Sequence, residues 1–477
     1  MINNIFYFDI ETQRTPFISD PFNNKTFTYG DLINYAKSIS SEKLNNVQTN
    51  DSILIITEDI YEIICHIIAC WIKKIIPAVL SPNLMWEEYE TFFYEFNFKK
   101  IITNKKNFTS KNVVSSELPS IINKTSNIFS LKFKHSDIAI ILFSSGTTGK
   151  QKGIPLSFEN VVSNIESFSN VLNLSEESVF LCTSPVYFAH GLYNSILTSF
   201  FLKKTIIYGG ILNIFNAIKL LNYISETSKV IYHITPSMIP ILCSSMSRLK
   251  SKSKIYFEKV ICGTSFLDQE SKLLFEKTFN TQILQQYGMT EVLFISINDK
   301  PIEKPNSVGK PLDIVELKIY NKKLISKKNI GEIHVKSTSY YGDYYPISKI
   351  INKSNFFSTG DLGYLDEDGY LFISGREKDL IKKGGLSISA KKIDEVLINY
   401  KDITNSFTFS KIDKDFGEEI YSLIEVSMKI NLADLKTYLA KKISRKFIPK
   451  KILVIDKIPR NEMNKFSINK ALKLINE

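Results

Sequence analysis

The stretch that decides the fold is Leu142-Phe143-Ser144-Ser145-Gly146-Thr147-Thr148-Gly149-Lys150-Gln151-Lys152-Gly153-Ile154. It follows an apolar run, residues 138–143, that is typical of a buried strand, and we expect it to precede a helix. Its glycines let the backbone approach a ligand closely and turn its N–H groups inward. Further donors and one positive charge come from Ser144, Ser145, Thr147, Thr148 and Lys152. The composition predicts a loop that holds polyphosphate.

This loop is not a Walker loop. That motif needs a serine or threonine after its Gly-Lys pair, whereas Gln151 follows Gly149-Lys150 here, and Gly146 lies too close. Polyphosphate binding by this loop therefore depends on a different spacing of its glycines, its hydroxyl side chains and its lysine.

Outside this stretch, apolar-periodic helices alternate with short β-branched strands. We expect strands at 53–56, 77–80, 100–102, 205–208, 230–233 and 259–262, with helices at 60–72 and 86–96. Such alternation predicts an α/β fold with mainly parallel sheets. After residue 300 strands follow one another closely, at 316–320, 332–336 and 370–374, which predicts a small β subdomain.

The last hundred or so residues are about the size of an independent domain. They predict a helix (390–399), two strands (405–410 and 421–428), a helix (432–442) and a strand (451–454). We therefore expect a large N-terminal domain over residues 1–375 and a small, mobile α+β domain over 376–477.

Composition sets broad limits on the class of protein. The chain has 477 residues, 44% of them hydrophobic and 12% aromatic, which excludes a disordered or coiled-coil protein. Its net charge of +11 suits anionic ligands, but the lysines are spread along the chain. A nucleic-acid partner is therefore not expected.

The cysteines and apolar stretches indicate a reducing compartment. The five cysteines lie in apolar runs without a C-x-x-C pair, which favours buried free thiols over zinc or disulfides. The N-terminus lacks a basic region followed by an apolar one, so no signal peptide is predicted. The most apolar stretch, 63–80, is interrupted by polar residues and proline, so no membrane span is expected. We expect a cytoplasmic protein.

The glycine-rich loop resembles the signature S-S-G-T-T-G-x-P-K-G of the adenylate-forming superfamily, which includes acyl-CoA synthetases, peptide-synthetase adenylation domains and firefly-type luciferases. Further similar motifs follow in the family's order and cover nearly the whole chain. The resemblance implies that the loop, with Gly146, Gly149 and Lys152, binds the phosphates of ATP.

Two more motifs imply nucleotide contacts in the first domain. Gln286-Tyr287-Gly288-Met289-Thr290-Glu291 is similar to Y-G-x-T-E, in which the aromatic ring stacks on adenine, Thr290 contacts the α-phosphate and Glu291 holds Mg²⁺. Cys262-Gly263-Thr264-Ser265 resembles the loop that lines both the adenine and the acyl pocket.

Three later motifs imply contacts near the domain boundary and beyond it. Thr359-Gly360-Asp361 matches T-G-D, whose carboxylate binds ribose hydroxyls. Gly375-Arg376-Glu377-Lys378-Asp379 matches a motif whose arginine, Arg376, reaches the nucleotide and whose hinge corresponds to Lys378. Pro459 to Lys465 resembles P-[KR]-[TN]-x-x-G-K, whose lysine, Lys465, acts in adenylation. Asn464 replaces the usual glycine; asparagine tolerates a left-handed backbone better than other non-glycine residues.

The acyl pocket is expected around Tyr187-Phe188-Ala189-His190-Gly191-Leu192-Tyr193-Asn194, which looks like the F-F-A-Y-G-L-x-N of benzoate-type CoA ligases. The stretch has no carboxylate to pair with an ammonium, so α-amino acids are disfavoured. Phe188, His190, Gly191, His233, Gly263 and Gly288 are the expected lining. A small aromatic or short-chain acid is the leading substrate class.

The acceptor is expected to be a thiol. Gly384 and Gly385 lie in Lys382 to Ser389, which resembles the G-G-x-x-I-x-P of CoA ligases, and adjacent glycines let a pantetheine arm pass close to the backbone. The thiol would be coenzyme A or the phosphopantetheine of a separate carrier protein.

The resemblance implies an AMP-forming acid–thiol ligase that uses ATP, Mg²⁺ and coenzyme A. Two alternatives stay open: a stand-alone adenylation enzyme that loads an acyl carrier protein, and a non-catalytic homologue that binds nucleotide. A luciferase-like oxygenase is a distant third possibility.

Overall fold

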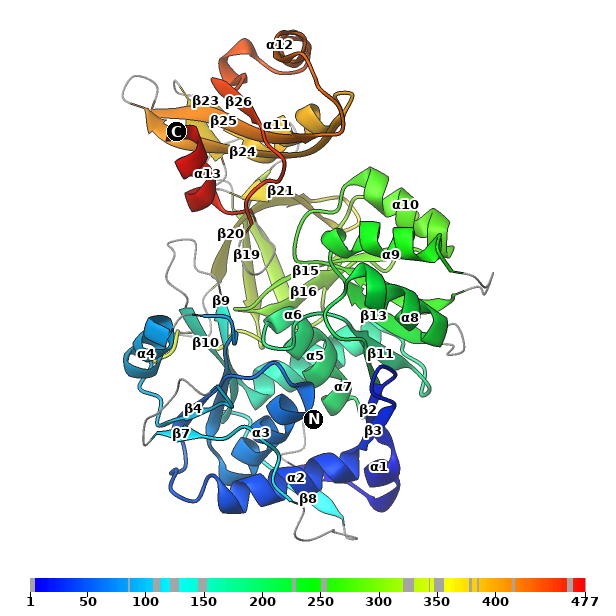
Figure 1. Ribbon diagram of the computed structural model, residues 1–477, viewed down its shortest axis with the longest axis vertical. Coiled ribbons are helices and arrows are strands. Elements are labelled where there is room, and N and C mark those ends of the chain that lie inside the picture. The colour runs from blue at the N-terminus through cyan, green and yellow to red at the C-terminus, as the bar shows by residue number, and fades with distance from the viewer. Residues whose placement is uncertain are drawn as a thin grey trace. The chain divides into compact units, whose positions relative to one another are not determined.

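A computed structural model describes residues 5–84, 86–105, 112–120, 128–144, 152–224, 229–249, 255–320, 330–342, 344–346, 356–376, 380–383, 386–413, 417–460 and 466–476. The chain divides into two compact units. The first comprises residues 1–317, 335–357 and 366–372, and the second comprises 318–334, 358–365 and 373–477. Figure 1 shows the elements along the chain. No helix in the described ranges is both long and apolar enough to cross a bilayer.

One sheet of the first unit contains the two strands that flank the glycine-rich stretch. Its order in the described chain is β10 (Lys152–Ser157), β9 (Ile138–Ser144), β5 (Ile76–Val79), β4 (Ser52–Ile55), β6 (Lys100–Ile102) and β7 (Val113–Val114). β4 runs parallel to β5 and β6, whereas β9 and β10 form an antiparallel pair. Helix α3 (Ile60–Lys73), capped by the Asp59 side chain, connects β4 to β5.

A second sheet of the first unit is mostly parallel and carries most of the candidate residues. Its order in the described chain is β17 (Lys310–Pro311), β16 (Leu293–Ile297), β15 (Ile283–Met289), β14 (Phe257–Cys262), β13 (Val230–Ile234), β11 (Val179–Cys182), β12 (Ile206–Tyr208), β2 (Pro16–Asp20) and β3 (Lys25–Thr28). The strands from β12 to β15 pair in parallel.

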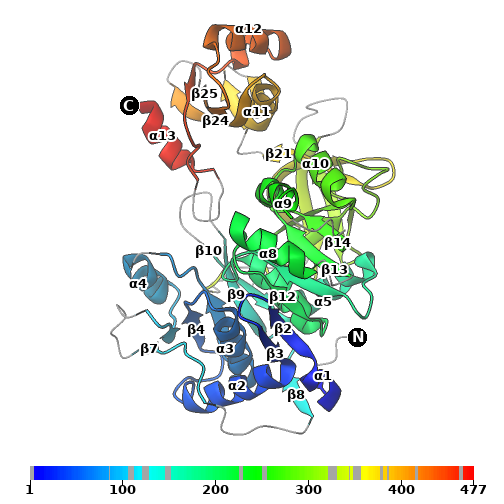
Figure 2. The ribbon, with the colours of Figure 1, turned by 45° about the vertical axis from the view of Figure 1, so that its right-hand side comes forward.

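Helices cover both faces of this second sheet, as its alternating side chains require. Ile231 and Tyr232 of β13 enter two different hydrophobic cores. Helix α5 (Phe158–Leu172) contributes Phe168 to the core on the Ile231 side. The other core contains residues of α8 (Ile214–Ile224), α9 (Ile239–Met246) and α10 (Gln269–Phe279). Figure 2 shows these helices beside β13 and β14.

A four-stranded sheet has the order β18 (Val315–Tyr320), β19 (Gly331–Ser337), β20 (Phe357–Leu365) and β21 (Leu371–Arg376). It is the small β subdomain that the closely spaced strands predict. The parallel-rich α/β class is confirmed with it. All five cysteines are free and buried, as their apolar surroundings predict.

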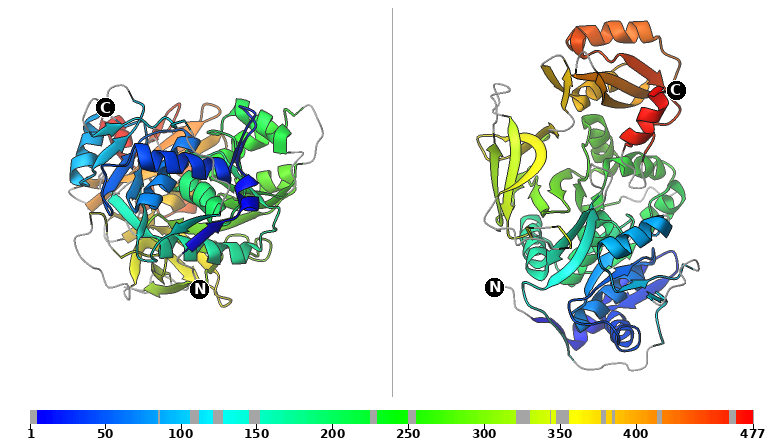
Figure 3. Two further views of the ribbon diagram at one scale, coloured as in Figure 1. Left: turned by 90° about the horizontal axis from the view of Figure 1, so that it is seen from below. Right: turned by 90° about the vertical axis from the view of Figure 1, so that its left-hand side faces the viewer.

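The C-terminal part of the second unit is built around β24 (Ile403–Asp413) and β25 (Gly417–Val426), to which β22 (Leu380–Lys383), β23 (Leu386–Ser389) and β26 (Lys451–Val454) add. Ile420 of β25 packs in one core with α11 (Ala390–Ile398) and α12 (Leu432–Lys442), and Leu423 packs in another with α13 (Ile468–Asn476). These elements are orange to red in Figure 3. The expected boundary at residue 375 stays a prediction, since Glu377–Asp379 lie outside the described residues.

Candidate active site

The carboxyl ends of the parallel strands bring together candidates that are far apart in the sequence. His190 follows β11, His233 lies in β13, Gly263 follows β14, and Tyr287 and Gly288 lie in the last three residues of β15. In open α/β sheets, ligands bind at this edge because loops, and not side-chain-covered strands, meet there. These candidates therefore lie at the edge of the sheet where open α/β sheets commonly bind ligands.

The glycine-rich loop connects two strands of the other sheet. Ser144 ends β9 and pairs in register with Lys152, the first residue of β10. A helix does follow this stretch, as expected, but β10 comes first and α5 begins at Phe158. Pro155 lies in β10, which is an edge strand of the described sheet, where a missing N–H is tolerated. Ser145, Gly146, Thr147, Thr148 and Gly149 lie outside the described residues.

Glu291 and Tyr344 line a small recess, and Lys152 contacts the Tyr344 ring. The recess is lined by Ile154, Glu291, Tyr340, Tyr341, Gly342 and Tyr344. The Lys152 ammonium lies 4.3 Å from the centre of the Tyr344 ring. Burial, followed by the nearby Glu291 carboxylate, raises the pKa of Tyr344 to about 12. One cation and one carboxylate thus lie close to the same tyrosine, an arrangement that the sequence patterns did not reveal.

Glu291 and Thr290 stand between β15 and β16, where the Val292 amide donates to the carbonyl of Met289 at 3.2 Å. Among the described residues, no group of three or more His, Cys, Asp or Glu side chains could enclose a metal ion. A lone carboxylate fits Mg²⁺, which is commonly held by one or two carboxylates together with water and substrate phosphates.

Gln286 packs between two of the predicted glycines. A Cβ atom on Gly263 would lie 2.7 Å from Gln286 Oε1, and one on Gly288 would lie 2.7 Å from Gln286 Nε2 and 2.3 Å from the Leu293 carbonyl oxygen. Both glycines are therefore needed for close packing around one buried amide. Thr264, with φ of 71°, and Ser265 are exposed beside them. Gln286 stands next to Tyr287 in the motif, but nothing in the sequence showed that it contacts Gly263.

The two candidate histidines of the acyl pocket lie together. Their ring centres are 6.4 Å apart, and His190 Nδ1 is 2.8 Å from Ser184 Oγ. Burial lowers the pKa of His190 to about 4. Burial, with a smaller contribution from His190, lowers the pKa of His233 to about 3. Both rings are therefore neutral at pH 7.

His233 is more enclosed than His190. It is 2% exposed, and its ring lies between those of Phe168, Phe180 and Phe294. Its Nε2 has no hydrogen-bond partner among the described residues. His190 and Phe188 keep part of their surface accessible. Of the two histidines, His190 is thus the one placed to contact a ligand.

Gly191 is explained by local packing. A Cβ atom there would lie 2.3 Å from the carbonyl oxygen of Pro185. Without a side chain, Gly191, the last residue of the short helix α6 (Ala189–Gly191), packs directly against the Pro185 carbonyl. Its place in a substrate pocket stays a prediction.

Asp361 and Arg376 form an ion pair within the second unit. Arg376 Nε donates to Asp361 Oδ1 at 2.8 Å, and the Asp361 amide donates to Thr359 Oγ1 at 3.1 Å. Asp361 is 4% exposed, whereas about half of the arginine side chain is exposed. The structure thus pairs Asp361, which is predicted to bind the ribose, with Arg376, which is predicted to contact the nucleotide. Lys378, Gly384, Gly385 and Lys465 lie outside the described residues.

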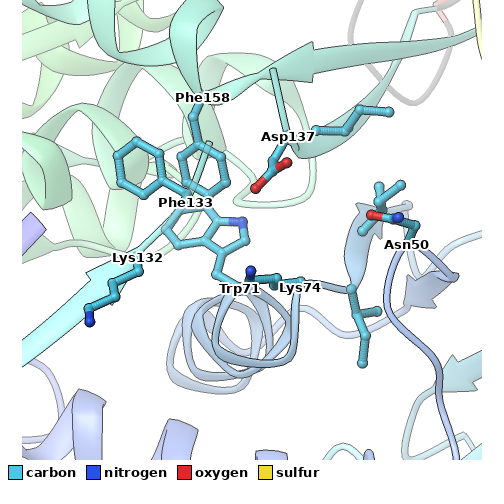
Figure 4. A pocket seen from close by; sticks show the side chains of 10 residues that line it. Asn50, Trp71, Lys74, Lys132, Phe133, Asp137 and Phe158 are labelled. Atoms are coloured by element: carbon cyan, nitrogen blue, oxygen red, sulfur yellow. The ribbon is translucent and has the colours of Figure 1, made fainter. Parts of the chain in front are cut away.

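A separate recess lies at the beginning of β9 and includes Trp71, Phe133, Asp137 and Phe158 (Figure 4). The Phe133 and Phe158 rings stack with centres 4.1 Å apart. Because Asp137 precedes β9 and Ser144 ends it, the full length of that strand, about 20 Å, separates this recess from the glycine-rich loop. It does not contribute to the candidate site.

Sequence comparison identifies a matching family and relatives. The model of the family described as "AMP-binding enzyme" matches residues 11–345. The 2-succinylbenzoate–CoA ligase of Oceanobacillus iheyensis is 28% identical over 92% of both chains. The malonate–CoA ligase of Arabidopsis thaliana is 23% identical over 94% of this chain and 85% of its own.

Solved structures share the fold. ATP-bound MatB from Rhodopseudomonas palustris has a TM-score of 0.85 at 20% identity, covering 98% of this chain and 96% of its own. The o-succinylbenzoate CoA synthetase of Bacillus subtilis, in complex with its acyl-adenylate, has a TM-score of 0.82 at 21% identity, covering 98% of both chains.

Proposed function

The chain belongs to the AMP-binding enzyme family, and we propose that it activates a small carboxylic acid with ATP and transfers the acyl group to the thiol of coenzyme A. The prediction of an AMP-forming acid–thiol ligase is confirmed by the family and by relatives named as CoA ligases. The structural observation that carries the proposal is that the Lys152 ammonium lies over the ring of Tyr344, which lines a recess together with Glu291.

In the first half-reaction, a carboxylate oxygen of the acid forms a bond to the α-phosphorus of ATP while the bond to the pyrophosphate oxygen breaks. Lys152 and the backbone of the 144–152 loop would bind the phosphates, and Thr290 would contact the α-phosphate. Glu291 would hold Mg²⁺, which when bound supplies charge stabilisation to the phosphate oxygens. Lys465 would add positive charge beside the reacting carboxylate.

In the second half-reaction, the thiol attacks the acyl carbonyl carbon and AMP leaves. Tyr287 and the Gly263–Ser265 loop would bind adenine, and Asp361 the ribose hydroxyls. The C-terminal domain would turn about Lys378, removing Lys465 and bringing Gly384 and Gly385 to the thiol. Such gating separates two reactions that need different groups at one site.

The acid is proposed to be aromatic or short-chain. Phe188 and His190 offer an aromatic wall and a neutral imidazole. A neutral ring hydrogen-bonds a polar group but does not neutralise a second carboxylate, so a monocarboxylic acid fits these residues best. The 2-succinylbenzoate and malonate named for the relatives carry two carboxylates and provide the contrast.

Carboxylate-dependent exchange of pyrophosphate into ATP tests the first half-reaction. The panel should contain benzoate, short aliphatic acids, 2-succinylbenzoate, malonate and amino acids. We expect exchange with benzoate or a short monocarboxylic acid and none with amino acids. Lys465→Ala should abolish exchange but retain thiol transfer from a supplied acyl-adenylate. Exchange with no acid in the panel by a protein that binds ATP would favour the non-catalytic alternative and implicate Asn464.

The acceptor needs its own measurement. Coenzyme A and a phosphopantetheinyl carrier protein should be compared with the acid found by exchange. The net charge of +11 would also suit an acidic carrier. Faster transfer to the carrier than to coenzyme A would replace the ligase proposal by the carrier-loading one. The predicted cytoplasmic location is part of the same proposal.

A further inference from the structure

Tyr344 is held against Lys152 by the backbone around both residues. Gly153 and Tyr345, the next residue in each segment, form an antiparallel bridge in which the Tyr345 amide donates to the Gly153 carbonyl at 2.7 Å. A Cβ atom on Gly153 would lie 2.8 Å from Phe96 and 3.3 Å from the Tyr345 Cβ, so the bridge is closely packed. The segment that carries Tyr344 is thus hydrogen-bonded to the beginning of β10, at Gly153.

Tyr345 anchors the segment independently of the recess. Its hydroxyl lies 2.9 Å from Ser52 Oγ of β4. Its ring stacks with those of Phe96 and Phe98, each at 6.4 Å between centres. These contacts fix the backbone on which Tyr344 stands, without involving Lys152 or Glu291.

The two neighbouring tyrosines therefore differ in what they contact. Tyr345 packs into the hydrophobic cluster around Phe96, whereas Tyr344 presents its ring to the Lys152 ammonium at 4.3 Å and lines the recess with Glu291. A cation over an aromatic face is attracted by the ring's quadrupole. An exposed lysine without such a contact samples many rotamers.

We propose that Tyr344 is a positioning residue that holds the Lys152 ammonium at the recess that Tyr344 and Glu291 line, so that the triphosphate of ATP meets an ordered cation there. This inference rests on the proposed function for its ligand. The ring acts through Lys152 and does not itself contact a reacting atom. A tyrosine on a segment remote in the sequence thus completes the phosphate end of the site.

A double-mutant cycle tests this contact by the binding of MgATP, measured by calorimetry without the acid. Tyr344→Leu should weaken binding by about two- to five-fold, the range that corresponds to a cation–π contact at an exposed site. Tyr344→Phe keeps the ring and should bind as the unchanged protein does. In a Lys152→Met background, Tyr344→Leu should produce no further loss, because the cation it positions is gone.

Tyr345→Phe is the matched control, since it removes a hydroxyl from the adjacent residue without touching Lys152. It should leave MgATP affinity unchanged. Additive effects of Tyr344→Leu and Lys152→Met, equal losses in Tyr344→Phe and Tyr344→Leu, or an equal loss in Tyr345→Phe would each overturn the proposal.

The cycle separates this inference from the proposed function. If MgATP binds and the cycle shows coupling, but no acid supports pyrophosphate exchange, the inference holds and the ligase proposal fails. If an acid supports pyrophosphate exchange but the cycle shows no coupling, the ligase proposal holds and the inference fails. Absence of MgATP binding by the folded, unchanged protein overturns both. Thermal unfolding of each variant verifies that the changes act on binding and not on folding.

Discussion

Arg376 Nε donates a hydrogen bond to Asp361 Oδ1 at 2.8 Å, between the neighbouring strands β21 and β20. The pair leaves one charge enclosed and the other partly in solvent, because Asp361 is 4% exposed and about half of the arginine side chain is accessible. The arginine thereby orients the carboxylate that the T-G-D motif assigns to ribose.

This pair predicts an asymmetric effect on stability. Arg376→Met should destabilise the protein more than the double variant Arg376→Met/Asp361→Asn, because the single change leaves an enclosed carboxylate without its cation. Urea unfolding measures the difference, which we expect to be about 1–2 kcal/mol given the exposure of the arginine. Asp361→Asn alone should also weaken ATP binding. An equal or greater loss of stability in the double variant would contradict the prediction.

The contacts of Gln286 predict different costs for two glycine substitutions. Gly288→Ala should be the more damaging, because its Cβ meets the Leu293 carbonyl oxygen at 2.3 Å, and backbone cannot move aside. Gly263→Ala meets mainly the Gln286 side chain, so adding Gln286→Ser should restore part of the lost stability. Thermal unfolding of Gly288→Ala and Gly263→Ala, each with and without Gln286→Ser, tests the order. A rescue of Gly288→Ala by Gln286→Ser would contradict it.

His233 predicts sensitivity of the first unit to acid. Its pKa of about 3 lies below the ordinary histidine value of 6.5, so the unfolded chain binds a proton first as pH falls. Stability present above pH 6.5 is then lost as pH falls toward 3, by up to roughly 5 kcal/mol. His233→Phe, placed among three phenylalanine rings, should flatten this dependence and raise stability at pH 7.

The measurement is urea unfolding of both proteins between pH 4 and pH 7. His190→Gln provides a comparison, because the pKa of His190 is also lowered, to about 4, and its removal should flatten the same window less. Parallel curves for the unchanged protein and His233→Phe would refute the assignment.

Asp394 predicts the opposite dependence in the second unit. Burial raises its pKa to about 6 although Ser406 Oγ and Thr408 Oγ1 each donate to it at 2.6 Å. Stability from this group is fully present below pH 3.8 and is lost as pH rises through 6, by up to roughly 3 kcal/mol. Asp394→Asn should remove this loss and stabilise the second unit at pH 7. Hydrogen exchange of β24 and β25 amides at pH 4.5 and 7 measures it locally, and an unchanged pH dependence in the variant would contradict the prediction.

The sequence alone determined the class of fold and the order of the motifs. Strands such as β13 and helices such as α3 follow from local apolar periodicity, which a window of ten to twenty residues contains. The glycine-rich loop and the residues from Tyr287 to Glu291 are likewise short contiguous patterns. Their physical requirements, small side chains and hydrogen-bond donors at fixed spacing, are visible without coordinates.

Only the tertiary structure decided which residues meet. The β9–β10 hairpin depended on which strand occupies the edge of a sheet, and the sequence of Lys152–Ser157 does not state its partner. The contact of Tyr344 with Lys152 and the packing of Gln286 against Gly263 join segments far apart in the chain. Such contacts depend on how complete elements pack, so no local pattern of residues encodes them, whereas the motifs themselves are local and could be found by reading along the chain.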